Sequence, residues 1–189
     1  NICFLIISQL VFFEKEDNIM DFEKLITERY SVRKFKNEHL SGECIDAIIN
    51  AAHKAPTGCN YQPQRILVLN TDESIEKLRS CTRSHFEAPT AMLVCYNEDE
   101  SWKRPYDGAL SAPVDAAIVT THIMLAAHNI GIGSCWVMHF DPFEIKKEFN
   151  LPDNIKPLAL LPMGYPDESA SPHEFHNTLR PVEDIVVYR

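Results

Sequence analysis

The stretch that decides the fold is residues 114–137, which read VDAAIVTTHIMLAAHNIGIGSCWV. Its first part, residues 114–130, predicts the longest helix of the chain, and Gly131 ends it because glycine readily adopts the left-handed C-cap conformation. Apolar residues leave this helix little polar face, which is typical of a helix buried on all sides. In a chain of 189 residues, a subunit interface is a natural place for such a helix. We therefore expect a homodimer.

Shorter apolar runs around this helix predict a sheet and further helices. Residues spaced three or four apart favour helices, whereas short runs rich in β-branched residues favour buried strands. We expect helices at 22–29, from a cap at Ser41 to just before Pro56, at 74–83 and at 142–149, and strands at 66–69, 91–96, 134–137 and 157–163. This pattern is typical of the α+β class with a mixed or mostly antiparallel sheet.

Composition and charge exclude several classes of protein. The chain has 18 Lys and Arg against 27 Asp and Glu, a formal net charge of −9. Binding to nucleic acid or to an anionic membrane surface needs a basic face, so we expect neither. Six scattered cysteines without a C-x-x-C pair argue against a zinc knuckle, a redox pair or a disulfide framework. We expect reduced thiols, a cytoplasmic location and no metal site.

Residues 1–19 differ from the rest of the chain. They read NICFLIISQLVFFEKEDNI and are followed by Met20. The apolar run is too short to cross a bilayer as a helix, and it lacks the flanks of a signal peptide. Lys15-Glu16-Asp17 can be encoded by AAG GAG GAT, which contains a bacterial ribosome-binding sequence. We interpret 1–19 as translated upstream DNA, with a membrane anchor as the alternative, and 20–189 as a single domain.

A cluster of cations follows the first predicted helix. Residues 29–36 read RYSVRKFK, which places four cations in eight residues of an acidic protein. These cations can satisfy the C-terminal dipole of the helix and otherwise be solvated. Alternatively, guanidinium groups and the Ser31 hydroxyl can form a site for an anion such as phosphate. Composition alone leaves both readings open.

Four ordered motifs over residues 20–189 resemble those of the nitroreductase family. They are Arg29-x-Ser31-x-Arg33-x-Phe35; Ala55-Pro56-Thr57-Gly58-x-Asn60-x-Gln62-Pro63; Gly131-Ile132-Gly133-Ser134-Cys135-Trp136-Val137, after the helix opened by Asp115; and Gly164-Tyr165-Pro166 with Arg180-Pro181. The resemblance implies a three-layer sandwich, with the long helix and a C-terminal arm at a dimer interface. A Rossmann site does not fit, because the paired glycines follow a helix and precede a strand.

The resemblance implies FMN as cofactor, in a site shared between two subunits. Arg29, Ser31 and Arg180 would hold the phosphate and ribityl chain, and Arg33 would approach the N1/O2 edge of the ring, where reduced flavin is anionic. The remaining implied residues are Tyr30; Pro56, Thr57, Gly58 and Asn60 from the other subunit; and Trp136, Val137, Met138 and His139 near N5. Family members often have a small residue beside this point, whereas this chain has Met138-His139. His139 is a candidate for pocket lining or proton donation.

The long polar stretch 97–111 resembles a lid or binding loop. Trp102, Arg104 and Tyr106 in it are candidates for the substrate pocket. His173-x-x-His176 has a spacing that could bind a metal, but no third ligand is in view, so we expect exposed loop histidines.

The implied activity is NAD(P)H-dependent reduction of nitroaromatics, quinones or flavins by a ping-pong mechanism through flavin N5. The alternatives are another flavin reaction on this scaffold, such as dehalogenation or flavin breakdown, and an FMN-binding sensor or store without turnover.

Overall fold

The computed structural model describes residues 21–189, so segment 1–19 and Met20 lie outside it. At its centre is a four-stranded sheet in the order β1-β2-β4-β3, with each neighbouring pair antiparallel. The strands are β1 (Gln64–Leu69), β2 (Thr90–Asn97), β3 (Gly133–Ser134) and β4 (Ile155–Gly164). The expected α+β class and mostly antiparallel sheet are confirmed.

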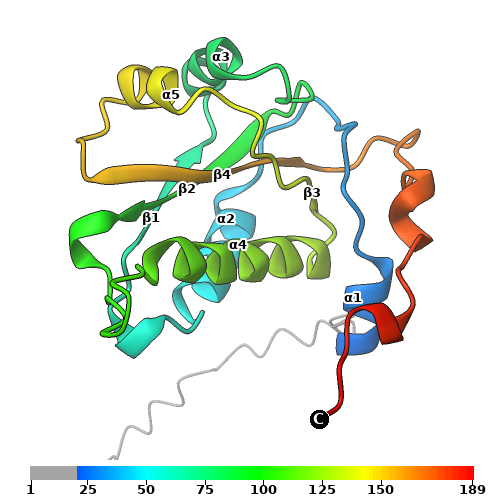
Figure 1. Ribbon diagram of the computed structural model, residues 1–189. Helices are drawn as coiled ribbons and strands as arrows, with labels where there is room; N and C mark the ends of the chain where they lie inside the picture. Colours follow the sequence, from blue (N-terminus) through cyan, green and yellow to red (C-terminus); the bar gives the residue numbers. More distant parts are fainter. Residues whose placement is uncertain (1–20) are drawn as a thin grey trace, which may run out of the picture.

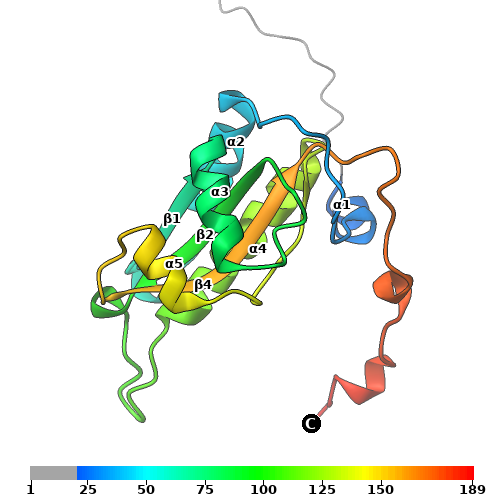
Figure 2. The same cartoon turned by 90° about the horizontal axis from the view of Figure 1, so that it is seen from above.

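Helices cover both faces of this sheet. They are α1 (Phe22–Glu28), α2 (Gly42–His53), α3 (Asp72–Cys81), α4 (Ala112–Asn129) and α5 (Pro142–Glu148). Helices α2 and α4 lie on one face and α3 and α5 on the other, which gives the expected three layers (Figure 1). Figure 2 shows the chain after β4 running as an arm along the side that carries α1. Short 3-10 turns complete the fold: η1 (Gly58–Asn60), η2 (Glu98–Glu100), η3 (Glu174–Asn177) and η4 (Val182–Asp184).

Each face of the sheet has its own apolar core. Ile48 of α2 and Ile123 of α4 are fully buried in the first core, against Met163 of β4. In the second core, Leu78 of α3 and Ile145 of α5 are buried with strand residues. Fully burying one such side chain stabilises the fold by roughly 1.5–3 kcal/mol. The two cores hold the sheet rigidly between its helical layers, and the site described below is built at the sheet's β3 edge.

Several helix ends follow the capping signals in the sequence. Ser41 caps α2, with its Oγ accepting a hydrogen bond from the backbone N–H of Cys44 at 3.3 Å. Gly131 has a φ of +80°, as expected for a residue that ends α4. Helix α3 begins earlier than predicted because Thr71 forms a capping box with Ser74. The predicted helix 74–83 is therefore wrong by two residues at each end.

The predicted strand 134–137 is also too long. Strand β3 ends at Ser134, and pairing with β4 resumes only as a single bridge between Val137 and Leu160. Between these points the chain faces Pro162, whose carbonyl accepts from the Cys135 N–H at 3.2 Å. Proline has no N–H to return a second bond, so the ladder is interrupted there.

Helix α4 buries one face within this chain, rather than every side. Its buried residues are Ala112, Asp115, Ala116, Val119, Thr120, Ile123 and Ala127. Val114 on the other face is 61% exposed, and Ile118 and Leu125 are only partly buried. These three residues recur at helical spacing, so they form an apolar stripe that the single chain leaves partly exposed. No helix in residues 21–189 is long and apolar enough to cross a membrane.

Candidate functional site

The basic segment 29–36 runs along the edge of the sheet at β3. Ser31 pairs with Ser134 in a parallel bridge, and the Val32 N–H donates to the Ser134 carbonyl at 3.1 Å. Further along, the Lys36 N–H donates to the Tyr165 carbonyl at 2.9 Å. Val32 is buried at 2% exposure, which turns its neighbours Ser31 and Arg33 outward. The segment thus extends the sheet and presents its polar side chains on one side.

Arg29 begins this segment in a half-buried position. Its Nη1 contacts the sulfur of Met124 on α4 at 4.0 Å. Burial lowers the pKa of the Arg29 guanidinium, while the nearby Cys135 thiol acts in the opposite direction. Among residues 21–189, neither Arg29 nor Arg33 forms an ion pair with a carboxylate. A partly desolvated cation without an acidic partner is a suitable ligand for an anion.

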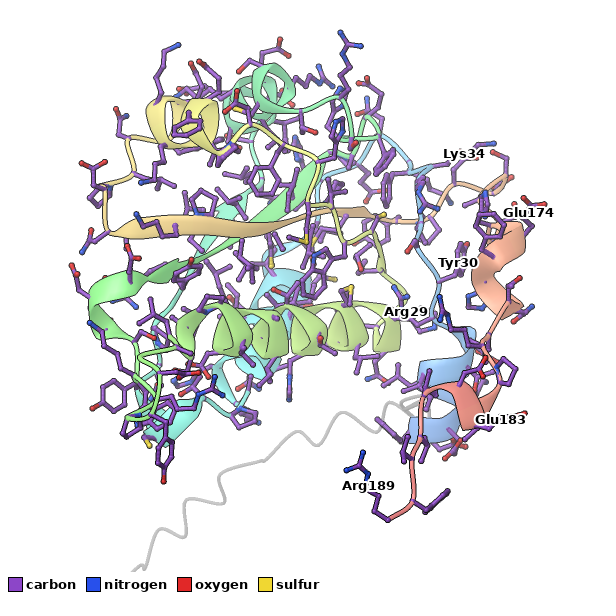
Figure 3. The ribbon with its side chains drawn as sticks, viewed as in Figure 1. Arg29, Tyr30, Lys34, Glu174, Glu183 and Arg189 are labelled. Atoms are coloured by element: carbon purple, nitrogen blue, oxygen red, sulfur yellow. The ribbon has the colours of Figure 1, made fainter. Side chains whose placement is uncertain are left out.

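These cations line a pocket of about 630 Å³ beside the C-terminal arm. Its lining residues are Arg29, Tyr30, Ser31, Arg33, His173, Phe175 and His176. Figure 3 shows Arg29 and Tyr30 on the segment after α1, next to the arm that carries Glu174. The pocket has the size of a small-molecule site, and the four cofactor residues expected near the start of the chain meet in it.

The second predicted motif forms a strained loop. Cys59, Asn60 and Gln62 all have positive φ, at 48°, 59° and 50°. Non-glycine residues pay of the order of 1 kcal/mol or more each for this conformation, so it persists only where the surroundings enforce it. The loop braces itself internally, because the Thr57 hydroxyl accepts from the Gln62 N–H at 3.0 Å.

A buried carboxylate ties this loop to α4. Asp115 is 2% exposed. Its Oδ1 accepts from the Gly58 N–H at 2.8 Å, and its Oδ2 accepts from the Ser111 hydroxyl at 2.8 Å. A side chain at Gly58 would press on Ser111, with the Ser111 Oγ only 3.0 Å from an added Cβ. Gly58 of the second motif is therefore held in place by Asp115 at the start of α4.

Within one chain, the two motifs lie at opposite ends of α4 (Figure 1). Gly58 is bound at Asp115, and Arg29 contacts Met124. The two α4 residues are about 14 Å apart along the helix axis, at 1.5 Å per residue. One chain therefore does not gather both motifs around a single pocket.

The residues expected near flavin N5 follow β3. Trp136 packs against the first core and Val137 is buried, whereas Met138 is 67% exposed. The His139 side chain is exposed, and its Nδ1 lies 3.2 Å from the Ser84 hydroxyl. His139 lines a second pocket, of about 730 Å³, with Arg79, Ser80, Cys81, Thr82, Arg83, Phe140, Asp141, Pro142 and Phe143. His139 thus lies on a solvent-accessible surface, and its proton-donor role stays a prediction.

The expected lid is an exposed turn before α4. Lys103 and Leu110 are bridged at its base, and Arg104 pairs with Asp107 inside it. Tyr106 is 95% exposed, while Trp102 is partly buried. The turn lies beside the Gly58 loop and at the opposite end of α4 from Arg29 (Figure 1).

Comparison with known proteins identifies the type of scaffold. The model of the nitroreductase family matches residues 26–94 and 83–165. The chain belongs to the nitroreductase family. A nitroreductase family protein of Clostridium difficile 630, solved as a crystal structure, is 40% identical, with a TM-score of 0.83 over 89% of this chain and 98% of that one. An "FMN-dependent nitroreductase" of C. difficile R20291 shares the fold at 23% identity, with a TM-score of 0.72 over 87% and 98% of the two chains.

Two curated nitroreductase relatives carry different names. One, from Methanothermobacter thermautotrophicus, is provisionally named NADH dehydrogenase/NAD(P)H nitroreductase and is 30% identical, over 79% of this chain and 80% of its own. The other is an iodotyrosine deiodinase of Thermotoga neapolitana, 28% identical over 76% and 88%. The expected family, fold and enzyme class, an NAD(P)H-dependent oxidoreductase, are confirmed.

The arm of this nitroreductase family member differs from expectation at two places. Arg180 lies exposed between η3 and η4 and does not line the pocket of Arg29. His173 and His176, expected to be loop histidines without a role, do line it, and His176 is partly buried. No local sequence signal predicts this position of the histidines, because the contact joins segments more than 140 positions apart.

Proposed function

We propose that this chain is an FMN-dependent oxidoreductase that uses NAD(P)H and acts as a homodimer. The observation that carries the proposal is the half-buried Arg29, which has no acidic partner among residues 21–189 and lines a pocket with Ser31 and Arg33. In a protein of net charge −9, such a local excess of cations suits an anionic group such as the FMN phosphate.

The residues present fit this cofactor. Arg29, Arg33 and Ser31 present their donors to one pocket. His128, on α4, lies outside that lining, and its buried Nε2 has no hydrogen-bond partner within the described part of the chain. Burial and the charge of Arg29 lower the pKa of His128, which favours the neutral ring beside that guanidinium. Arg29 and Ser31 would hold the phosphate end, and Arg33, with its guanidinium 5.9 Å from the Phe86 ring centre, would stabilise negative charge on the flavin ring. The chemistry that FMN supplies when bound is hydride acceptance from NAD(P)H, followed by reduction of an acceptor in a ping-pong cycle.

The dimer would complete the site. The partly exposed stripe of Val114, Ile118 and Leu125 is suited to pack against a second α4. In an antiparallel pair of these helices, the Gly58 end of one subunit lies near the Arg29 end of the other. The loop 57–62 would then close the flavin pocket of the partner subunit, and the turn at Trp102 and Tyr106 would accompany it to the acceptor side.

The direct test is the absorbance spectrum of the purified protein and its affinity for added FMN. Arg29→Ala should weaken FMN binding at least about tenfold, because it removes a charge-assisted contact. Lys36→Ala is the matched control, since Lys36 belongs to the same basic segment but does not line the pocket. A wild-type protein that carries no flavin and binds none would refute the proposal. NADH or NADPH oxidation with and without menadione would then separate turnover from storage.

A mixed dimer tests whether the site is shared. Arg29→Ala and Asn60→Ala homodimers should both be deficient in flavin. A heterodimer of the two variants should regain one intact site per dimer if the motifs come from different subunits. If both motifs act within one chain, the heterodimer stays as deficient as its parents.

Reductive dehalogenation is a second candidate, favoured by the resemblance to the iodotyrosine deiodinase. Halide release from an iodinated phenol under anaerobic, reducing conditions would support it. Release no faster than from free FMN would exclude it for that substrate class.

A further inference from the structure

We propose that His173 and His176 of the C-terminal arm are phosphate ligands of this flavin site, so that FMN is held more tightly as the pH falls. The inference rests on the proposed function, because the ligand is the phosphate of FMN. It adds two residues to the site and a pH response to the cofactor's affinity.

The pocket has nitrogen donors on both sides. Arg29 and Arg33 line it from the segment after α1, and His173 and His176 line it from η3. None of its lining residues is a carboxylate. Glu174 lines the neighbouring pocket, with Lys34. An anion in the first pocket would therefore meet donors from two elements and no acidic lining residue.

Backbone contacts fix the position of His173. Its Nδ1 accepts a hydrogen bond from the Phe175 N–H at 3.2 Å and so caps η3. A ring nitrogen that accepts carries no proton, so the neutral ring must hold its proton on Nε2. That N–H remains available to donate to an oxygen in the pocket. The His173 and Phe175 rings also lie 4.7 Å apart, which restricts the histidine further.

His176 lines the pocket beside Tyr30. Its ring lies edge-on to Tyr30, with ring centroids 6.3 Å apart. Within residues 21–189 its side chain forms no ion pair, and only its backbone N–H is bonded, to the His173 carbonyl at 2.8 Å. The charged or titratable groups around it are Arg29, Tyr30 and Arg33 across the pocket and His173 and Glu174 on its own turn. A phosphate dianion bound among these groups would favour a protonated histidine as its ligand.

Proton uptake and phosphate binding are therefore linked. Histidine side chains change charge between about pH 5 and 8, and binding that takes up a proton strengthens as pH falls. Phosphate monoesters take up their own second proton near pH 6, so the useful range lies above that value. Riboflavin lacks the phosphate and should show no such response.

The experiment measures the Kd of FMN and of riboflavin by fluorescence at about pH 6.5 and about pH 8.5. Wild-type affinity for FMN should be about five- to tenfold higher at the lower pH, since one linked proton can change affinity by up to about tenfold per unit. His176→Asn should remove most of this response, and His173→Asn should weaken FMN binding at both values. His53→Asn, on the exposed end of α2, should behave as wild type. Phosphate protonation is common to all variants and cancels in the comparison.

Several outcomes would overturn the inference. FMN binding with the wild-type pH response in His176→Asn would remove that residue from the site, and unchanged affinity in His173→Asn would remove the other. An equal pH response for riboflavin would show that the phosphate is not involved. Absence of FMN binding at any pH would instead refute the proposed function as well. Should a variant fold poorly, histidine NMR of the wild type decides: FMN, but not riboflavin, should raise the titration midpoint of the His176 ring.

Discussion

Gly133→Ala is expected to destabilise the fold. Val32 of the basic segment 29–36 packs directly on this glycine and leaves no room for a side chain. A Cβ at position 133 would lie 2.7, 2.8 and 2.9 Å from Cγ2, Cβ and Cγ1 of Val32. Ordinary contact between carbon atoms is about 3.5–4.0 Å, so one side must move by nearly 1 Å. Val32 is 2% exposed and its N–H is held by Ser134, which prevents an easy escape.

Overpacking of this kind costs about 1–3 kcal/mol, and the rigid surroundings place Gly133→Ala near the upper end. With a urea slope of about 2 kcal/mol/M, the midpoint of unfolding should fall by more than about 1 M. Gly42→Ala is the control: no atom lies within 4 Å of its added Cβ, and alanine favours the helix by up to about 1 kcal/mol.

A double variant tests the cause of that loss. Val32→Gly removes all three clashing atoms, so the paired change should cost at least about 1 kcal/mol less than the sum of the single changes. Strict additivity, or a Gly133→Ala protein as stable as wild type, would refute the reasoning.

Two further predictions concern buried groups. Asp115→Ala should lower the free energy of unfolding by about 2–4 kcal/mol, because the Gly58 N–H and the Ser111 hydroxyl lose a charged acceptor; wild-type stability in urea would contradict this. Burial raises the pKa of the Cys95 thiol to about 12, so near pH 8.5 an alkylating reagent should spare Cys95 in the native protein and modify it in urea-unfolded protein. The unfolded thiol loses its proton near pH 8.5, whereas the folded one keeps it, so stability present below that pH should decline as pH rises toward 12; equal labelling of Cys95 in native and unfolded protein would contradict the assignment.

Local signals in the sequence predicted much of the fold. Caps such as Ser41 and Gly131 act within a few residues, and apolar spacing placed each helix and strand to within a few positions. Strand 134–137 was predicted too long because its interruption depends on Pro162, which meets it only in the folded sheet. The alternation of side chains along a strand does not show which residues of the neighbouring strand will face it.

The sequence predicts which residues belong to the candidate site, but only part of how they are arranged in space. The motifs at Arg29 and Gly58 were found, yet their separation along α4 appears only in three dimensions. Gly133 lies against Val32, and His176 lines a pocket with Tyr30. Both contacts bring together residues more than 100 positions apart in the sequence, so local sequence patterns do not predict them.

Asp115 carries a consequence for how the enzyme would lose its cofactor. Helix α4 carries the partly exposed apolar stripe proposed for the dimer interface. Through Asp115 it also binds the loop 57–62 that is proposed to cover the flavin of the partner subunit. Separating two copies would then uncover two flavins at once, so retention of FMN by the protein would depend on protein concentration. Dilution, rather than competition by another ligand, would then release the cofactor.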